Sequence, residues 1–489
     1  MPDPKVNVSH LEGGLLADPR RVIARPFLPG AAPRIRTVIE RVLSLTDAQV
    51  TSMLTSLVAD YRQRHKDIRG IFRQNYASAS ALQDGRFELS EERRLLAGAY
   101  FTHEYSLESA ALFNPSMVAH PDQNGVRPGA TRFILSLRAC GEGHISSIEF
   151  RTGILDARHE LSLDPLTRFA LTARPMDDTR YDKSTYVLKL VEMAGHNQWA
   201  EPILARLDDE FTMSDLKDAI DESRPRDGKV TLWQETIDNM LWLAHSNYDL
   251  DFSPESELSE RVIFPVSVNE SRGIEDARFV RFTHQDGRVA YYATYTAYNG
   301  FRVLPQLIET SDFRHFKVST LNGRCVQNKG MALFPRKIGD DFVMASRLDG
   351  ENIYMLRSSN LDFWNESKLV HAPLYPWEFI QVGNCGSPIE TDEGWILLTH
   401  GVGPMRQYWI GALLLDLEDP SRVLGSLPDP ILMPEPSERD GYVPNVVYSC
   451  GGMRHGDHLV IPYAVADTRI RYATLAIPEL LQTFSRDVA

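Results

Sequence analysis

Residues 274–298, IEDARFVRFTHQDGRVAYYATYTAY, contain the pattern that decides the fold. The acidic pair Glu275–Asp276 opens a strand-like run, the turn HQDG (284–287) follows, and a second run rich in aromatic and β-branched residues ends in YTAY (295–298). Two such runs on either side of a turn predict a β-hairpin. We therefore treat a polar opening, a hairpin and a polar or aromatic ending as one repeating unit.

This unit occurs five times along the chain. The paired segments are FNPSMV with FILSLR, IEDARFVRF with YYATYTAY, KGMALFPRKI with FVMASR, GSPIETDEG with WILLTH, and PNVVYSCGG with LVIPYAVADT. Their openings lie near residues 114, 276, 329, 387 and 445, so the last four openings are 53, 58 and 58 residues apart. Five units of similar length, mostly antiparallel strand, predict an all-β core in the form of a five-bladed β-propeller.

Two helical segments interrupt the β pattern. Residues 46–65 place apolar side chains on one helix face, and a second helix is predicted from Ser90, as N-cap, to Phe113. The first two openings are 162 residues apart, and the surplus over one blade also has helical periodicity, at 184–207 and 230–248. Its apolar residues Trp233, Met240, Trp242 and Leu243 are predicted to be core, with a subunit interface or a lid as the alternative.

These patterns divide the chain into five parts. We predict an irregular N-terminal segment with one strand (1–37), a helical extension (38–112), a first blade (113–158), a helical insertion (159–260), and the remaining blades (261–489), β to the end.

Composition excludes several classes of function. A net charge of −14 argues against a general nucleic-acid binder. No run approaches 18 apolar residues, so no membrane span is expected. The four cysteines (140, 325, 385, 450) form no CxxC pair, and the start MPDPKVNVSHLEGG lacks a signal peptide, which together predict a reduced, cytoplasmic protein. Neither a metal-binding spacing nor a Gly-rich phosphate loop is found, so no metal and no nucleotide are expected.

The candidate site follows from the propeller geometry. The inner strand of every blade faces the central axis, so polar residues at equivalent points of five blades converge on one pocket. The openings supply Asn114, Glu275, Asp276, Lys329, Ser387 and Asn445, and the endings supply Arg138, Tyr295, Tyr298, Arg347, His400 and Asp467. Carboxylates, amides and aromatic rings suit a sugar, and Lys329, Arg347 and His400 together suit an anion such as phosphate. His144 and Glu149 are candidates for a substrate channel or for a structural role.

The motifs resemble those of glycoside hydrolase family 130, the mannoside phosphorylases and β-mannosidases. The matching segments are FNPS (113–116), GIEDAR (273–278), YTAY (295–298), NKGMALFP (328–335), GSPIETDEGWILLTHG (386–401), VPNVVYSCG (443–451) and YAVADT (463–468). The chain departs from the family pattern at Ala277, where a proline is expected, at Gly330, where an acid is expected, and at Thr399, where many relatives have tyrosine.

The resemblance implies an inverting phosphorylase that converts a β-mannoside and inorganic phosphate into α-mannose 1-phosphate. Asp276 is then the proton donor, acting through the mannosyl 3-hydroxyl. Lys329, Arg347, His400 and Arg278 bind phosphate. The mannosyl unit is bound by Asn114, Arg138, Glu275, Tyr295, Tyr298, Asn445 and Asp467. Phosphate is a co-substrate, no cofactor is implied, and the helical extensions imply a homo-oligomer.

Three alternatives remain open. Asp276 could form an ion-pair ladder with Arg272 and Arg278 at a blade edge, and the tyrosines could serve inter-blade packing. A β-mannosidase on the same scaffold is the second function, and retention of the Lys, Arg and His positions favours phosphate over water. A non-catalytic glycan-binding propeller is the third, and it predicts loss of the central acid.

Overall fold

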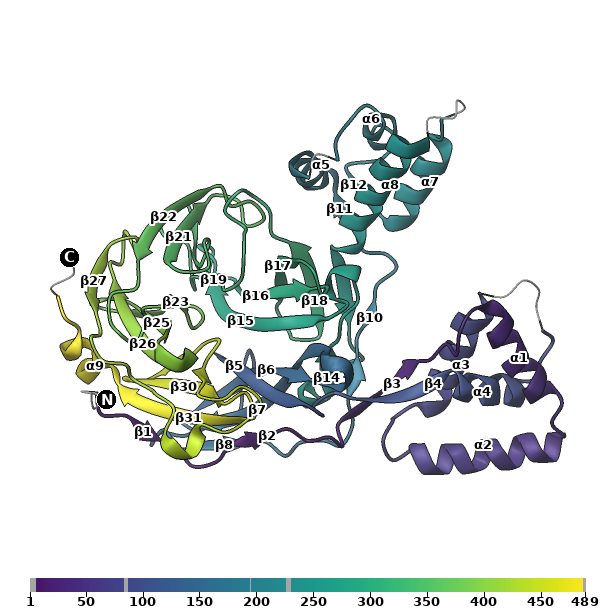
Figure 1. Ribbon diagram of the computed structural model, residues 1–489, viewed down its shortest axis with the longest axis horizontal. Coiled ribbons are helices and arrows are strands. Elements are labelled where there is room, and N and C mark those ends of the chain that lie inside the picture. The colour runs from purple at the N-terminus through teal and green to yellow at the C-terminus, as the bar shows by residue number, and fades with distance from the viewer. Residues whose placement is uncertain (1–5, 83–86, 194, 226–229, 487–489) are drawn as a thin grey trace.

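The protein is described by a computed structural model for residues 6–82, 87–193, 195–225 and 230–486. Figure 1 shows a body of β-sheets from which two groups of helices project. The body is mostly antiparallel strand, as the hairpin repeats predict.

The first two antiparallel units share one twelve-stranded sheet. They are joined because β15 pairs in parallel with β7 at Gly273 and Ser146. The first unit comprises β5 (Ala111–Ala119), β6 (Thr131–Cys140), β7 (Ser146–Leu155) and β8 (Leu161–Leu163). The second comprises β15 (Gly273–Thr283), β16 (Val289–Tyr298), β17 (Val303–Thr310) and β18 (His315–Thr320).

Three further units form separate sheets, and Figure 1 shows all five units around a common centre. The third comprises β19 (Ala332–Leu333), β20 (Phe342–Ser346), β21 (Ile353–Ser358) and β22 (Glu366–His371). The fourth comprises β23 (Gln381–Asn384), β24 (Ile389–Thr391), β25 (Gly394–Val402), β26 (Tyr408–Leu415) and β27 (Val423–Ser426). The fifth comprises β28 (Val447–Tyr448), β29 (Met453–His455), β30 (His458–Val465) and β31 (Arg469–Ala476).

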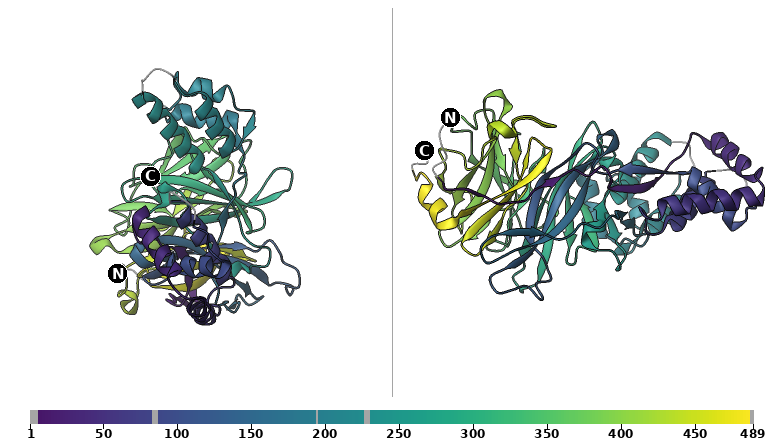
Figure 2. Two further views of the ribbon diagram at one scale, coloured as in Figure 1. Left: turned by 90° about the vertical axis from the view of Figure 1, so that its right-hand side faces the viewer. Right: turned by 90° about the horizontal axis from the view of Figure 1, so that it is seen from below.

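The two ends of the chain meet on the fifth unit (Figures 1 and 2). Strands β1 (Ser9–His10) and β2 (Leu15–Leu16) both pair with β31, so the beginning of the chain supplies the outer edge of the last sheet. The prediction that the chain is β to the end is wrong for α9 (Ile477–Thr483), which buries Ile477 and Leu480 against that sheet.

Apolar clusters lie at every junction between neighbouring units. Val280 and Leu356 share a cluster between the second and third units, and Phe334 and Trp395 share one between the third and fourth. The last junction is also apolar, because Phe133 of the first unit packs in one cluster with residues of the fifth. Burial of these faces is the main force that holds the sheets side by side.

Each unit opens with a residue in the left-handed backbone region. The φ angles are 49° at Asn114, 56° at Asp276, 64° at Asn328, 96° at Gly386 and 63° at Asn445. Asparagine, aspartate and glycine are the residues that tolerate this region best. The backbone kinks therefore fall on the predicted openings Asn114, Asp276 and Asn445, and one residue before the predicted openings Lys329 and Ser387.

The N-terminal helices form an arm beside the body (Figure 1). The arm comprises α1 (Ala32–Leu43), α2 (Asp47–Tyr61), α3 (Ile68–Ser80) and α4 (Glu91–Tyr100). A ribbon of β3 (Val22–Pro26) with β4 (Thr102–Ser106) connects it to the body. Among the described helices none is by itself long and apolar enough to cross a membrane. Only the pair α1–α2, bent by 110°, passes that test by length and composition together.

Ser90 caps α4 as predicted, but the helix predicted to reach Phe113 ends at Tyr100. Residues 102–106 pair instead with β3, and β5 begins at Ala111. These residues do not form a helix despite their helical spacing, because β3 offers a hydrogen-bonding partner that the sequence pattern does not reveal.

The insertion forms a second helical group with its own core. Its helices are α5 (Lys183–Glu192), α6 (Ala200–Leu204), α7 (Met213–Glu222) and α8 (Val230–His245). Its short strands, and those that return the chain to the body, are β9 (Leu171–Thr172), β10 (Arg174–Pro175), β11 (Tyr181–Asp182), β12 (Glu210–Phe211), β13 (Tyr248–Asp251) and β14 (Arg261–Ile263). Trp233, Met240 and Leu243 are buried in this core and Trp242 packs against it, as predicted. Strand β13 pairs with β18 and so anchors the insertion to the second unit.

A buried cluster of two guanidinium and two carboxyl groups ties the N-terminal segment to the first unit. The Arg21 guanidinium lies 2.7 Å from a Glu149 oxygen and 3.3 Å from Glu108, and Arg151 contacts the same two carboxylates at 3.1 and 2.6 Å. All four side chains are at most 6% exposed. Glu149, a candidate for a substrate channel, therefore has a structural role.

We expect Arg21→Met to lower the free energy of unfolding by about 3–5 kcal/mol, because it removes one of the two guanidinium groups that pair with the buried Glu149 carboxylate. Arg20→Met is the matched control, since the Arg20 side chain is 88% exposed and should matter little. Urea unfolding at neutral pH measures both. Equal effects of the two substitutions would contradict the structural importance of the buried cluster.

Candidate active site

Asp276 lies in a bulge near the start of β15. The pairing with β16 shifts between Glu275 and Arg278, and Asp276 occupies the left-handed region there. A bulge breaks the alternation of side chains along a strand and re-aims one of them. Glu275 and Asp276, which a regular strand would send to opposite faces, accordingly both contact Arg138.

Residues of the first unit hold the Asp276 carboxylate. Asn114 donates from Nδ2 to Oδ1 at 2.6 Å, and Arg138 donates from Nη1 to the same oxygen at 3.1 Å. Asn114 lies in an equivalent bulge of β5, where the pairing with β6 shifts between Phe113 and Ser116. The side chain of Asp276 is only 16% exposed, so it does not point into bulk solvent.

The charge state of Asp276 is set by its neighbours. Burial acts to raise the pKa of its carboxyl group, but Arg138, Arg278, the hydrogen bond from Asn114 and the charge of Lys329 outweigh burial and lower the pKa to about 2. Asp276 is therefore a carboxylate at neutral pH in the protein without ligands.

Glu275 connects the second unit to the first and third. One of its oxygens accepts from Arg138 Nη2 at 2.7 Å, and the other accepts from Lys329 Nζ at 2.5 Å. The ammonium of Lys329 also lies 5.8 Å from the centre of the Tyr298 ring. Lys329 is therefore held at Glu275, and no contact between described residues joins it to Arg347 or His400, with which it was grouped as a phosphate ligand.

A second cluster lies behind Asp276 and comes from the second to fifth units. Arg278 donates to the backbone carbonyl of Asp276 at 2.9 Å and to the Tyr448 hydroxyl at 2.8 Å. The Tyr448 ring is 4.9 Å from the ring of His400, whose Nε2 is 3.5 Å from Arg347 Nη1. Arg278 of this cluster thus contacts the candidate acid residue, and Arg347 is linked to it through Tyr448 and His400.

His400 contributes no positive charge to this cluster. Burial lowers the pKa of its imidazole well below the usual value, and the charges of Arg347 and Arg278 lower it further. Its Nδ1 lies 3.2 Å from the backbone carbonyl of Asn384, which favours the tautomer with a proton on Nδ1. His400, predicted to help Lys329 and Arg347 bind an anion, is therefore a neutral ring whose Nε2 faces Arg347.

The place of His400 and Arg347 depends on a glycine. A Cβ atom at Gly383 would lie 2.5 Å from His400 Cε1 and 3.4 Å from Arg347 Cδ. Gly383 lies on β23 directly opposite His400 on β25, so a larger residue there would push the imidazole away from Arg347.

The structure separates the two tyrosines that the sequence analysis grouped. The Tyr295 hydroxyl donates to Glu270 at 2.5 Å and lies 3.1 Å from a Gln306 oxygen inside the core, so it is not available to a sugar. Tyr298, three residues on, faces the opposite side of β16 and lines the cleft described below. An odd spacing along a strand has this consequence, because side chains alternate between its faces.

The two remaining predicted residues come from the fifth unit. Asp467 has a φ of 53° and is close enough to Asp276 that burial, and then the Asp276 charge, raise the pKa of its carboxyl group to about 7. Asn445 is half-buried just before β28, and its backbone carbonyl accepts from Tyr408. No hydrogen bond between described residues links the Asn445 side chain to Asp276.

A cleft of about 320 Å³ opens beside these groups, within the range of small-molecule sites. It is lined by Arg138, Glu275 and Tyr298 of the predicted set and by Phe113, Arg272 and Tyr442, among others. His144 also lines it, and its Nδ1 lies 2.9 Å from the Tyr442 hydroxyl. The first and fifth units therefore meet across one wall of the cleft.

Sequence reasoning missed three residues that shape the site: Tyr448, Asn384 and Tyr442. Tyr448 lies inside the segment VPNVVYSCG but after the opening of its unit, where the repeat pattern marks no polar position. Asn384 donates from Nδ2 to the Gly330 carbonyl and so connects the third and fourth units. Tyr442 lies in a loop, where no periodicity marks a functional side chain.

Comparison with known proteins identifies the family of this chain. A model of glycoside hydrolase family 130, described as β-1,4-mannooligosaccharide phosphorylase, matches residues 248–486. The 1,2-β-oligomannan phosphorylase of Thermoanaerobacter sp. (strain X514) is 36% identical over 231 residues, which are 44% of this chain and 74% of that protein. The chain belongs to glycoside hydrolase family 130.

Two further comparisons show the extent of the similarity. The β-1,2-mannobiose phosphorylase of Listeria innocua serovar 6a is 32% identical over 231 residues, which are 45% of this chain and 62% of that protein. A solved structure of the Listeria innocua β-1,2-mannobiose phosphorylase in complex with β-1,2-mannobiose aligns with 78% of this chain and 92% of its own, at a TM-score of 0.46 and 22% identity.

The family 130 match begins after the insertion and leaves out the first unit. Yet Asn114 and Arg138, which hold the Asp276 carboxylate, both belong to that unit. The site is therefore completed by a segment that the family match does not cover.

The low pKa of Asp276 predicts a pH-dependent contribution to stability. A carboxyl group with a depressed pKa stabilises the folded state fully above its unfolded pKa, near 3.8, and this contribution is lost as the pH falls through about 2. Between pH 5 and pH 2 we expect the unfolding free energy of the wild type to fall by about 2 kcal/mol more than that of Asp276→Asn. Urea titrations across this range measure the difference, and parallel curves would contradict the assigned environment.

Proposed function

We propose that this protein is an inverting phosphorylase that cleaves a β-mannoside with inorganic phosphate and releases α-mannose 1-phosphate. One observation carries the proposal: the Asp276 carboxylate accepts from Arg138, which lines the cleft together with Glu275, and the Asp276 backbone carbonyl accepts from Arg278, which belongs with Arg347 to the second cluster. Relatives that are 36% and 32% identical are named as phosphorylases of 1,2-β-oligomannan and β-1,2-mannobiose, so a β-1,2-linked mannoside is the first substrate to test.

The mannosyl unit would bind at the cleft end of the site. Asn114, Arg138, Glu275, Tyr298 and Asp467 supply amide, guanidinium, carboxyl and aromatic groups of the kind that recognise a sugar. Asn114 Oδ1 and Arg138 Nε are buried and have no hydrogen-bond partner among the described residues. Because leaving buried polar atoms unpaired costs free energy, hydroxyl groups of a bound sugar are suitable partners for them.

Phosphate would bind at the two guanidinium groups. The Nε atoms of Arg278 and Arg347 are also buried without a hydrogen-bond partner among the described residues. Arginine offers paired donors that match the oxygens of phosphate. His400, being neutral, would act by positioning Arg347, and Lys329 would add charge only after loosening its contact with Glu275.

The same arrangement explains how Asp276 could act as an acid despite its low pKa. The positive charge of Arg138 and Arg278 keeps its carboxyl group ionised. A bound phosphate would offset part of that charge, and a bound sugar would exclude water, so both would raise the pKa of Asp276. Protonation would thus be favoured only in the complex with both substrates.

The reaction needs one acid and no general base. Asp276 gives its proton to the leaving oxygen of the glycosidic bond, directly or through a hydroxyl of the sugar, and an oxygen of phosphate forms the new bond to the anomeric carbon from the opposite face. Phosphate is already anionic, so the protein has only to align it and stabilise its charge. No cofactor is required by this chemistry.

We also propose that the five β units are the blades of a five-bladed β-propeller. Two features support this: each unit opens with a left-handed residue, and each junction between neighbours, the last with the first included, is an apolar cluster. The residues around Asp276 come from all five units, as side chains around one axis should.

A β-mannosidase is the second candidate, and one observation favours it. Inverting hydrolysis uses a second carboxyl group as base, and Asp467 lies near Asp276 with a pKa raised to about 7. The cluster of Arg278 and Arg347 favours phosphate over this alternative, because a hydrolase that uses water has no anion for a second guanidinium group to bind.

Location and assembly remain part of the proposal. All four cysteines are free and buried, which suits a cytoplasmic protein. Leu188 and Val191 on α5 are each 53% exposed, and such apolar residues on the helical insertion support self-association, which the mass of the protein in solution tests.

We expect β-1,2-mannobiose to yield mannose 1-phosphate only when phosphate is present, and Asp276→Asn to lower the turnover number by about 10²–10⁴-fold with the disaccharide still bound. Asp60→Asn, on the exposed surface of α2, is the control and should retain full activity. Chromatography of the products with and without phosphate measures this. Cleavage independent of phosphate would assign the β-mannosidase. Binding without turnover, unchanged in Asp276→Asn, would assign a glycan-binding protein.

Tyr448→Phe should weaken phosphate binding and spare mannoside binding. It keeps the ring beside His400 but removes the hydroxyl that accepts from Arg278, so we expect a rise of about 5–10-fold in the phosphate half-saturation concentration. Tyr408→Phe is the matched control. Its ring is 5.9 Å from His400, but its hydroxyl makes no hydrogen bond to a described residue. Equal effects of the two variants on phosphate would refute the role assigned to Tyr448.

A further inference from the structure

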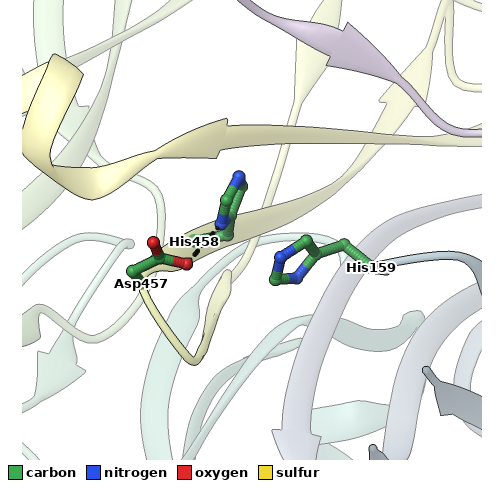
Figure 3. A group of neighbouring side chains, drawn as sticks. All are labelled: His159, Asp457 and His458. Atoms are coloured by element: carbon green, nitrogen blue, oxygen red, sulfur yellow. Dashed lines mark hydrogen bonds and ion pairs between the residues drawn. The ribbon is translucent and has the colours of Figure 1, made fainter. Parts of the chain in front are cut away.

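Two histidines and an aspartate meet at the seam between the first and fifth units, away from the candidate active site. His159 lies in the loop between β7 and β8, and Asp457 and His458 lie at the turn between β29 and β30. Their ligand-type atoms all lie within 4.8 Å of one another. Figure 3 shows a ring nitrogen of His159 facing the Asp457 carboxylate and the His458 ring.

No hydrogen bond to a described residue fixes the orientation of the His159 ring. Its Nδ1 is buried without a partner, and neither ring nitrogen bonds to any described residue. The ring nevertheless lies with its centroid 3.8 Å from that of His458. The ring nitrogens of His159 are therefore free of hydrogen bonds to described residues while they lie near a second imidazole.

A third histidine, His455, lies next to the candidate ligands but is not one of them. His455 also packs against His159, with ring centroids 5.1 Å apart, but both of its nitrogens are occupied. Nε2 lies 2.9 Å from the Asp156 carbonyl, and Nδ1 lies 3.0 Å from the Thr131 hydroxyl. His455 therefore supports the cluster and does not belong to the ligands.

The charge of the cluster suits a cation. The unpaired ring nitrogen of His159 offers a lone pair to such an ion. Asp457 Oδ1 lies 2.7 Å from His458 Nδ1 and supplies a negative charge. The Asp457 side chain is 71% exposed, so an ion can enter from solvent.

We propose that His159, Asp457 and His458 bind one divalent transition ion, Zn²⁺ by preference, with water as the fourth ligand. Two imidazoles and one carboxylate are ligands that zinc accepts, and imidazole disfavours Mg²⁺ and Ca²⁺. A tetrahedral zinc ion holds its ligand atoms ~3.4 Å apart, so side-chain movements of about 1 Å close the site. No sequence motif predicted it, because the ligands come from turns about 300 residues apart.

The position gives the site a structural role. The first and fifth units are the two ends of the circle of sheets, and an ion bound to both hairpin turns would pin them together. The site does not touch Asp276 or the residues that hold it. We therefore expect metal binding to change stability and to leave mannoside phosphorolysis unchanged.

The test uses full-length, tag-free protein that has been dialysed against EDTA. Equilibrium dialysis with ZnCl₂ should give one zinc ion per chain, and the midpoint of thermal unfolding should rise by roughly 3 °C at a hundredfold excess over the dissociation constant. His159→Asn and His458→Gln should each weaken zinc binding by about 100-fold or more and abolish the rise. Asparagine is chosen because His159 has a φ of 64°, which asparagine tolerates.

His245→Gln is the matched control, because His245 is an exposed histidine on α8 that lies 2.7 Å from the carbonyl of Leu241 in its own helix. It should bind zinc as the wild type does. The midpoints of thermal unfolding in EDTA show whether each variant is folded. If His159→Asn does not fold, the zinc binding of His458→Gln alone tests the proposal. A wild type that binds no zinc, or zinc binding and a thermal shift that survive in the two variants, would overturn the proposal.

Discussion

The ion pairs of Arg138 with Glu275 and Asp276 are the interaction on which the candidate site depends. They join β6 to β15 across 137 and 138 residues of sequence, with the whole helical insertion between them. Glu275 extends the same network to Lys329 of the third unit. One guanidinium therefore aligns two sheets, sets the charge of the candidate acid and orients the carboxylate that holds a lysine.

The distribution of charge around Asp276 is uneven, and this unevenness is what the proposed chemistry needs. Glu275 and Arg138 line the cleft, and Arg278 lies in the second cluster with Arg347 and a neutral His400, whose ring lies near those of Tyr408 and Tyr448. Under the proposed function, the guanidinium groups of the second cluster would attract phosphate. The acid would stay ionised until phosphate binds, so the two substrates and the proton would be coupled by electrostatics.

Much of the fold could be predicted because its signals are local. A hairpin is marked by its turn residues, and the opening of a unit is marked by asparagine, aspartate or glycine at a backbone kink. An amphipathic helix is marked by the periodic spacing of its apolar residues. Each of these signals lies within a short stretch of sequence. The errors arise where the local sequence pattern is misleading. Residues 102–106 have helical spacing but pair with β3, and α9 follows a β region without a change in texture. In both places a distant partner outweighs the local preference.

By itself the sequence determined the five repeats, the two helical segments and the polar residues at the openings and endings, including Asp276, Arg138 and Arg278. Only the tertiary structure decided which of these residues meet, and in what charge state. Tyr295 points into the core, His400 is neutral, Lys329 is bound to Glu275, and Tyr448 completes the arginine cluster. The reason is physical: the face on which a side chain lies and the pKa of a titratable group depend on burial and on neighbours from other units, and neither is encoded within a single repeat.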